Sequence, residues 1–429
     1  MVINRLFRNL RNNLVKNILM ITSGTVFAQI LNLALLPIIT RLYTPDQYGV
    51  VSVFVAILAT MRLFSTFNYE MGMPIAEDDE KAINVLALSV IILLSFLCIF
   101  GIVLLFWGDK FLTLLNGGVL VEYKYFLVLG LLFVGSYHIL TQWAYRKKDF
   151  RVITKTKFIQ PVSQNFINIV LGLMGKGAVG LLLGKIIGQS AGISSLTYPL
   201  IKDDKNLLKK INKREILWAL KRYIRFPLYT TPRKFIGEII GSLPILFLSA
   251  VYGPQIAGLY GLANGVIQLP MNIIGTSVSN VFYAESAALR RSNPHRIKEL
   301  SNKLLKYLII FGLFPISILV LFGEFLFSLV FGSKWAEAGV YAALLSFGVF
   351  SKLIFRPISN IFDICERQEL ALILNIFGLV LVLLVFGITS YLALSSYWTV
   401  GLYSVAIAAL YLIQYILAQK VLNEEIFNS

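Results

Sequence analysis

The chain has 429 residues, of which 57% are hydrophobic and only 14% charged, and its mean hydropathy is +0.76. Soluble domains usually contain about 45–50% apolar and about 25% charged residues, so this composition excludes a water-soluble globular fold. Twelve membrane spans of about 20 residues need about 240 residues, which nearly exhausts the apolar content of the chain. We therefore expect an all-α integral membrane protein without a sizeable soluble catalytic domain.

Apolar runs separated by short polar breaks predict twelve transmembrane helices. They lie at residues 18–40, 48–68, 82–107, 125–145, 158–175, 178–199, 227–251, 256–282, 307–328, 336–360, 370–392 and 396–419. The first run follows four basic residues, as in a secretory signal, but it is long enough to span and shows no clear cleavage site, so we expect it to stay uncleaved. The break at 200–226 has apolar residues at near-helical spacing and predicts an amphipathic surface helix.

The basic residues are distributed unequally between the two sides of these spans. The chain has 39 Lys and Arg residues against 22 acidic ones, a net charge of +17. With the N-terminus in the cytoplasm, the cytoplasmic segments hold 28 Lys and Arg residues and the outer connections hold five. Because cytoplasmic loops are enriched in Lys and Arg, both termini are predicted to be cytoplasmic. The net positive charge is therefore explained by the membrane topology and does not indicate binding of a nucleic acid.

A short repeat divides the chain into two halves. Tyr43, Pro45 and Gly49 follow the first span, and the same residue types recur 209 residues later, after the seventh span, as Tyr252, Pro254 and Gly258. Six plus six spans in the same orientation imply two six-helix bundles around a central cavity that forms the substrate path. We place the N-terminal bundle and its cytoplasmic linker at 1–212 and the C-terminal bundle at 213–429.

Three further motifs lie at or near the outer ends of predicted spans: TRLYTPDQYG at 40–49, GLYGLA at 258–263 with Pro270, and FGSKWAEAG at 331–339. They resemble motifs of the Wzx-type polysaccharide and O-antigen flippases, the polysaccharide branch of the multidrug, oligosaccharidyl-lipid and polysaccharide exporter superfamily. The resemblance implies transport of an undecaprenyl-pyrophosphate-linked oligosaccharide from the inner to the outer leaflet of the bacterial plasma membrane. It also implies a role in O-antigen (lipopolysaccharide), capsule or exopolysaccharide synthesis, with the polymerase and chain-length machinery as further partners beside the membrane lipids.

Six basic residues fall inside predicted spans, where charges are costly and often functional. They are Arg62, Lys185, Arg233, Lys234, Lys352 and Arg356. We expect them to bind the anionic pyrophosphate. Lys352 is the main candidate, because 11 residues of helix, about 16 Å, separate it from Asp363 and place it near the midplane. Arg356 lies one turn away on the same helical face, although snorkelling to the surface is the alternative for it.

The remaining candidates are open to structural explanations. Lys234 and Glu238 are four residues apart and could neutralise each other, in a span interrupted by prolines that we expect to move during transport. Lys185 lies among glycines that permit close helix approach, and a cavity-facing side chain is expected. Glu238 and His138 are the candidates for ion coupling, with movement driven by the membrane potential as the alternative. Glu70 is expected to be a solvated residue at the inner surface.

Other function classes fit the sequence less well. A multidrug or organic-cation exporter of the same superfamily would need buried carboxylates, and Glu238 is the one deep acid in the spans. A membrane polysaccharide polymerase would need a substantial outer loop, and the longest, at 108–124, carries no catalytic constellation. The two cysteines form no zinc motif, and nucleotide-binding and catalytic-triad motifs are absent from the sequence. We expect no enzymatic activity, no metal and no cofactor.

Overall fold

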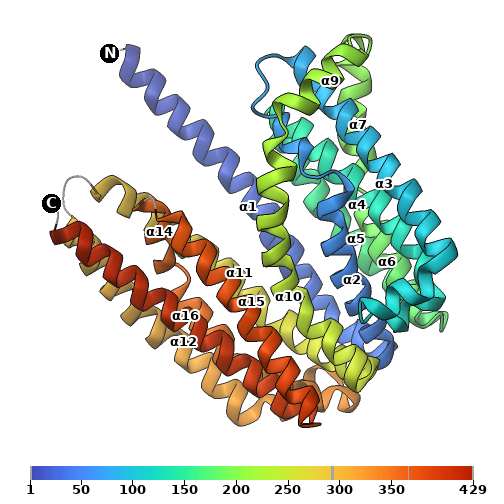
Figure 1. Ribbon diagram of the computed structural model, residues 1–429, viewed down its shortest axis with the longest axis vertical. Helices are drawn as coiled ribbons and strands as arrows, with labels where there is room; N and C mark the ends of the chain where they lie inside the picture. The colour runs from blue at the N-terminus through green and yellow to red at the C-terminus, as the bar shows by residue number, and fades with distance from the viewer. Residues whose placement is uncertain (1, 291–293, 366, 428–429) are drawn as a thin grey trace. The chain divides into compact units, whose positions relative to one another are not determined.

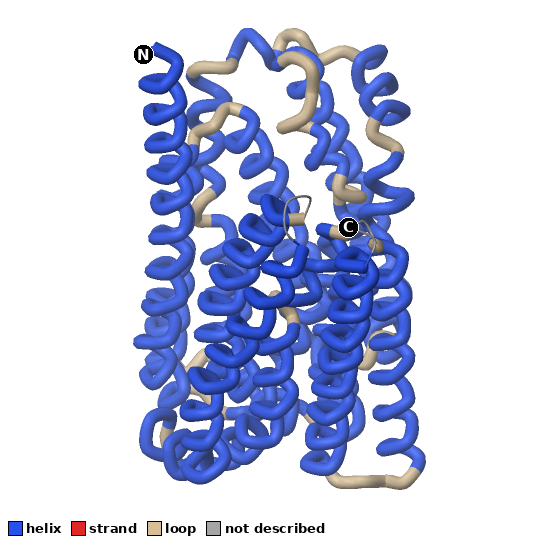
Figure 2. The backbone as a smooth tube through the Cα atoms, turned by 90° about the vertical axis from the view of Figure 1, so that its left-hand side faces the viewer, coloured by secondary structure: helices blue, strands red, loops and turns tan. Residues whose placement is uncertain are grey.

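The computed structural model describes residues 2–290, 294–365 and 367–427, and within these ranges all regular structure is helical (Figure 1; Figure 2). A chain this apolar has to satisfy its backbone hydrogen bonds within each segment when it lies in lipid, and a helix does so. The all-α prediction is confirmed.

Twelve helical segments correspond to the predicted spans. They are α1 (Val2–Leu42), α2 (Pro45–Ser65), α3 (Asp79–Leu114), α4 (Lys124–Arg146), α5 (Phe150–Leu173), α6 (Ala178–Ser190) with α7 (Ile193–Lys202), α10 (Thr231–Tyr252), α11 (Pro254–Leu289), α12 (Pro294–Phe331), α13 (Ala336–Phe355), α15 (Gln368–Tyr391) and α16 (Ser396–Phe427). Within the described ranges, ten helical segments are long and apolar enough to cross a membrane, and α5 and α11 are outside that set. Both of these carry several amide side chains.

Short elements join the long helices. They are η1 (Tyr69–Gly72), η2 (Gly118–Tyr123), α8 (Lys205–Leu208), α9 (Lys213–Arg222), the π-helical η3 (Phe226–Thr230), η4 (Ser333–Trp335), η5 (Ile358–Asn360) and α14 (Ile361–Ile364). The predicted amphipathic linker is thus two short helices. The side chain of Asn212 caps α9 by accepting a hydrogen bond from the Glu215 N–H at 2.9 Å.

The contacts divide the chain into two units. The first comprises residues 1–43 and 53–238, and the second comprises residues 44–52 and 239–429. In the first unit α1 packs on α5, α5 packs on α6, and α3 packs on α4. In the second unit α13 packs on α11, α12 and α16, and is its central helix. The predicted boundary lies after residue 212, whereas by contacts residues 213–238 group with the first unit.

The repeated motif forms a reciprocal contact within the second unit. A Cβ atom on Gly49 would overlap the backbone carbonyl of Pro254, and a Cβ atom on Gly258 would overlap the backbone carbonyl of Pro45. Each glycine therefore allows the start of its own helix to approach the start of the other, because any side chain would fill the gap between the backbones. The two copies of the motif are therefore in contact through their prolines and glycines.

Both repeats also begin their helices with a specific cap. Thr44 and Gln47 form reciprocal hydrogen bonds between side chain and backbone at 3.1 and 3.4 Å, and Pro45 occupies the first helical position. In the second repeat Gly253 has φ +89° and Pro254 again begins the helix. A positive φ of this kind favours glycine. Sequence alone therefore determines where α2 and α11 begin.

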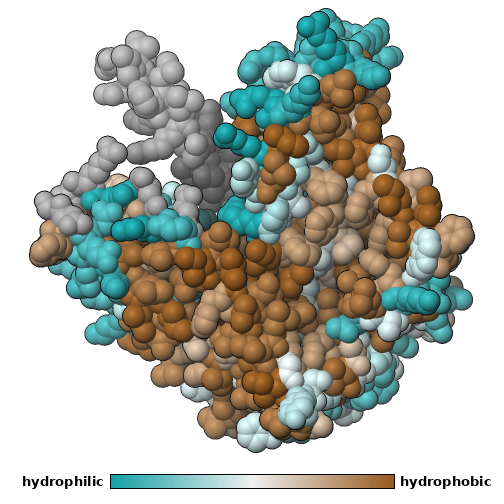
Figure 3. Space-filling model, in the orientation of Figure 1, coloured by the Kyte–Doolittle hydropathy of each residue, from teal (hydrophilic) through white to brown (hydrophobic). Residues whose placement is uncertain are grey.

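The surface of the helices is strongly apolar. Side chains on α12 such as Phe314 (72% exposed) and Leu321 (72% exposed) have no cover within the chain. Figure 3 shows apolar residues along the flanks of the helices and hydrophilic residues over the end that carries α9. Large exposed apolar surfaces require a nonaqueous surrounding, so these flanks are the lipid-facing surface of a multi-pass membrane protein.

Candidate functional site

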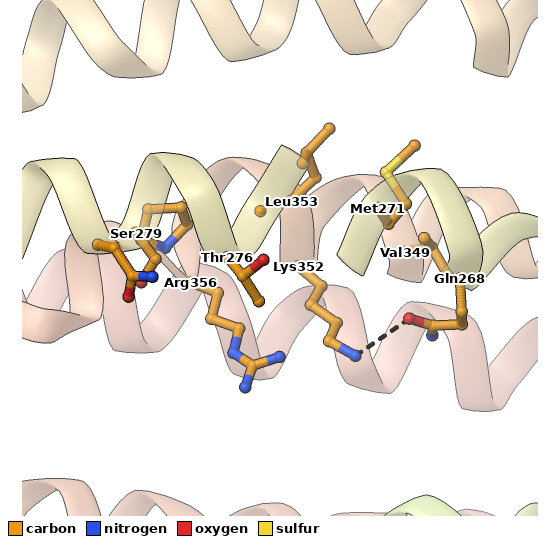
Figure 4. Close-up of a pocket in the computed structure, with 11 residues that line it drawn as sticks. Gln268, Met271, Thr276, Ser279, Val349, Lys352, Leu353 and Arg356 are labelled. Atoms are coloured by element: carbon orange, nitrogen blue, oxygen red, sulfur yellow. Dashed lines mark hydrogen bonds between the residues drawn. The ribbon is translucent and has the colours of Figure 1, made fainter. Parts of the chain in front are cut away.

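A cavity of about 230 Å³ lies between α11 and α13 in the second unit (Figure 4). Lys352 and Arg356 line it from α13 and the turn that follows, and their side chains extend in the same direction. They are one helical turn apart, so the shared face that the sequence predicted is observed. The helix ends at Phe355, however, and not at residue 360. The assumption of one continuous helix from Lys352 to Asp363, on which its predicted depth was based, was therefore wrong.

Hydrogen-bonding side chains of α11 form the opposite wall of this cavity. They are Gln268, Thr276, Ser279 and Asn280. The wall is held in place from outside, because Asn360 Nδ2 donates to the carbonyl and hydroxyl oxygens of Ser279 at 3.1 and 2.8 Å. Pro270 lies within α11 close to the cavity, where it removes one backbone donor and disfavours a straight helix.

The electrostatics of this cavity favour an anion. Lys352 Nζ donates to Gln268 Oε1 at a long distance of 3.3 Å, which leaves two of its three N–H donors available. The guanidinium group of Arg356 has no hydrogen bond or ion pair to any residue that the structure describes. The lining includes two cations and no carboxylate. Such a set can donate several charge-assisted hydrogen bonds to phosphate oxygens, which are among the strongest in proteins.

A second group of polar side chains lies in the first unit, where α10 meets the turn after α2. Lys234 Nζ donates to Asn68 Oδ1 at 2.9 Å and contacts Met71 Sδ at 3.2 Å. The Asn68 amide donates in turn to Thr231 Oγ1 at 2.8 Å. The described ion pairs do not include one between Lys234 and Glu238, the alternative that the sequence left open for this pair.

Glu70 belongs to the same turn and corrects another expectation. It is 4% exposed, whereas the sequence predicted a solvated surface residue. The turn has left-handed backbone at Phe67 (φ 49°) and Asn68 (φ 59°), which reverses the chain sharply enough to direct Glu70 into the protein. Such a reversal has no reliable signal in a sequence, since neither position is glycine.

The other residues of the first unit that the sequence suggested for the site differ in how far they are buried. Arg62 and His138 are partly buried, and the charges of Arg62 and Lys234 act on His138. Glu238 is partly buried on α10 and Arg233 is exposed there. Arg62, Lys234 and His138 thus form one electrostatic neighbourhood. Lys352 and Arg356 form the other one, in the second unit.

Lys185 is partly buried on α6, where the predicted close helix approach is confirmed. A Cβ atom on Gly184 would overlap Asn168 Oδ1, and one on Gly188 would lie 2.6 Å from Gln164 Cβ. The adjoining face of α5 is rich in amides, and Asn165 donates to Asn32 Oδ1 of α1 at 2.7 Å. These amides were not predicted as candidates from the sequence, because uncharged polar residues in a span give no pattern that separates packing from binding.

A family comparison covers most of the chain. Residues 38–340 match the model of a family described as polysaccharide biosynthesis protein. The chain belongs to this family. The matched range includes the repeated Tyr, Pro and Gly motif and the outer-loop motif at 331–339, so the resemblance expected from those residues is confirmed.

Two solved structures share the fold of this chain. An inward-closed conformation of the lipid II flippase MurJ has a TM-score of 0.73 at 14% identity, covering 94% of this chain and 87% of that one. An inward-facing multidrug resistance MATE family transporter of the MOP superfamily has a TM-score of 0.70 at 16% identity, covering 95% and 99%. These likenesses show the two-bundle fold. No curated protein matches the sequence significantly.

Proposed function

We propose that this protein is a flippase that moves a polyprenyl-pyrophosphate-linked oligosaccharide from the inner to the outer leaflet of a bacterial plasma membrane. The observation that carries the proposal is the cavity of the second unit, where Lys352 and Arg356 line one space with four uncharged hydrogen-bonding side chains. The membership in a polysaccharide biosynthesis family and the fold shared with a lipid II flippase support the same class of substrate.

The substrate needs such a site for a simple physical reason. A sugar unit with about ten hydroxyls would lose several kcal/mol for each hydroxyl left unpaired in hydrocarbon, so unassisted movement is very slow. The pyrophosphate adds negative charge that must be matched at depth. Lys352 and Arg356 match the charge, and Gln268 and Asn280 offer both donors and acceptors to the adjoining sugar.

The size of the cavity indicates which part of the substrate it binds. Pockets that enclose a whole drug-sized ligand measure about 300–1,000 Å³. A cavity of about 230 Å³ is smaller than this and suits a pyrophosphate with at most its first sugar. The lipid tail would remain in the bilayer, and the outer sugars would occupy the polar path. Alternating access of the two bundles would expose this site first to one side of the membrane and then to the other.

A multidrug exporter is the second candidate, because a MATE family transporter shares the fold. A transporter for organic cations requires carboxylates in its site, whereas the cavity described above is lined by two cations and no acid. Uptake of a cation into this cavity would bring like charges together. The charge of the site therefore favours the flippase.

Complementation of a bacterial strain that lacks its polysaccharide flippase tests the proposal. We expect wild type and Lys352→Arg to restore the polymer and Lys352→Ala to fail at equal membrane abundance. Lys334→Ala is the matched control, because it removes an exposed lysine from the same unit. Full restoration by Lys352→Ala would contradict the assigned site, and efflux of organic cations in place of polymer restoration would support the exporter.

A further inference from the structure

The first unit contains a buried carboxylate, Glu70, that is influenced by two cations. It is not one of the residues of the proposed anion site. Glu70 is 4% exposed, and its Oε2 atom has no hydrogen-bond partner among the described residues. Thr66 is hydrogen-bonded to the carboxyl group. A carboxylate that is buried and only half satisfied is unfavourable unless it binds a proton or a compensating charge.

The turn that holds Glu70 is fixed to α10 by hydrogen bonds of the uncharged Asn68 side chain. Asn68 accepts a hydrogen bond from Lys234 Nζ at 2.9 Å and donates one to Thr231 Oγ1 at 2.8 Å. Lys234 is therefore tied to the chain two residues before Glu70, and the described ion pairs include none between the two residues. Lys234 Nζ also donates to Met71 Sδ at 3.2 Å, so one of the three donors of its ammonium group stays available for another acceptor.

Burial and the neighbouring groups act in opposite directions on the proton affinity of Glu70. Burial raises the pKa of the Glu70 carboxyl group, while the Thr66 hydrogen bond and the charges of Lys234 on α10 and Arg62 on α2 lower it. Removal of either cation, or its neutralisation by a bound anion, would therefore raise this pKa further.

Other titratable groups border the same turn. Tyr223 packs its ring against Gly72, and His138 of α4 lies in the field of the same two cations. Arg146, at the end of α4, donates to the Ala76 carbonyl and is paired with Asp79 of α3 at 2.9 Å. The acidic partner of Arg146 is thus Asp79 and not Glu70. Of the described acidic groups, Glu70 is the one that faces Lys234 and Arg62.

We propose that Glu70 is a proton-binding site whose occupancy is linked to the binding of an anion at Lys234 and Arg62. When Glu70 is ionised, it offsets one of the two positive charges and competes with the incoming anion. When a proton from solvent binds the carboxylate, both positive charges face the two negative charges of a pyrophosphate diester. The identity of the anion as a pyrophosphate headgroup rests on the proposed function.

The proposal can be tested because proton binding at Glu70 and anion binding at the two cations are thermodynamically linked. If protonation of Glu70 strengthens anion binding, then anion binding must strengthen protonation by the same factor. A suitable probe is UDP-glucose, a soluble pyrophosphate diester that stays fully ionised between mildly acidic and mildly alkaline pH. Its binding to the purified full-length protein can be measured by calorimetry across this range.

We expect the affinity of wild type for UDP-glucose to rise as the pH falls, because Glu70 becomes protonated. Glu70→Gln should bind the probe about fivefold or more tightly than wild type at alkaline pH and should lose the pH dependence. Glu77→Gln is the matched control, since it removes an exposed carboxylate from the same connection, and it should behave as wild type. Equal pH profiles for Glu70→Gln and wild type would overturn the inference.

A second readout uses the unaltered Glu70. Dicyclohexylcarbodiimide modifies protonated carboxyl groups in apolar surroundings, and peptide mass spectrometry measures the modified fraction of Glu70. We expect UDP-glucose to increase this fraction in wild type, and Lys234→Met to increase it without the probe. No change in either case would overturn the inference.

The two proposals fail differently in these measurements. If Lys352→Met loses binding while Glu70→Gln keeps the pH profile of wild type, the proposed site stands and the proton site is refuted. If Lys352→Met binds normally while Glu70→Gln loses the pH dependence, the proton site stands and the cavity of the second unit is refuted as the anion site.

Discussion

Replacement of Lys352 by methionine should weaken the binding of a pyrophosphate diester without unfolding the protein. Methionine keeps an unbranched apolar stem like that of lysine, one atom shorter, and the one hydrogen bond lost within the protein is the 3.3 Å contact with Gln268. The two remaining N–H donors are those available to the phosphates. One hydrogen bond to a charged group contributes about 1.5–3 kcal/mol, so we expect a loss of roughly 10- to 150-fold in affinity.

Calorimetric titration of the purified protein with UDP-glucose measures this loss. Lys334→Met serves as the control, because Lys334 is exposed and lies outside the cavity. The melting temperature of each variant shows whether the fold is intact. An affinity for Lys352→Met within a factor of two of wild type, in a protein that melts normally, would refute the assignment of Lys352 to the anion.

Three further predictions concern stability. Gly49→Ala places a methyl group against the Pro254 carbonyl, and overpacking of this kind should destabilise the protein by about 1–3 kcal/mol, seen as a lower melting temperature. Tyr43→Phe removes the 2.6 Å hydrogen bond from the Tyr43 hydroxyl to the Asn168 carbonyl and should reduce stability by about 0.5–1.5 kcal/mol or more. For Glu70, whose pKa is raised, stability should be greatest at low pH and fall as the pH rises through that pKa; Glu70→Gln should therefore melt at a higher temperature than wild type in alkaline buffer and at about the same temperature in acid. A melting temperature for Gly49→Ala equal to wild type, or parallel pH profiles for Glu70→Gln and wild type, would contradict these expectations.

The helices could be predicted from sequence because the signal was strong. Runs of about 20 apolar residues occur where a bilayer requires helices, and capping pairs such as Thr44 with Gln47 mark where they begin. The repeat of Tyr43, Pro45 and Gly49 could also be found in the sequence, but the contact between its two copies could not be predicted. Contact between Gly49 and the second copy depends on how helices approach each other, which spacing along one chain does not specify.

The candidate sites were only partly predictable, for a related reason. Lys352 and Arg356 stand out because charges are rare in spans and because four residues form one helical turn. Gln268, across the cavity, does not stand out, since an amide in a membrane helix serves packing as often as binding. Glu70 was misjudged because its position near the end of a span suggested solvent, whereas the left-handed turn at Asn68 buries it.

The most direct test of the central claim is translocation by the purified protein in vesicles. A polyprenyl-pyrophosphate-linked oligosaccharide is incorporated into both leaflets, and an enzyme or lectin that cannot cross the membrane reports the sugars exposed on the outside. Protein-containing vesicles should make nearly all of the lipid-linked sugar accessible with time, and vesicles with Lys352→Ala should retain the inner-leaflet fraction, as protein-free vesicles do. If wild-type vesicles also retain the inner-leaflet fraction, or if Lys352→Ala flips the lipid as fast as wild type, the account of this protein as a flippase with its anion site at Lys352 is contradicted.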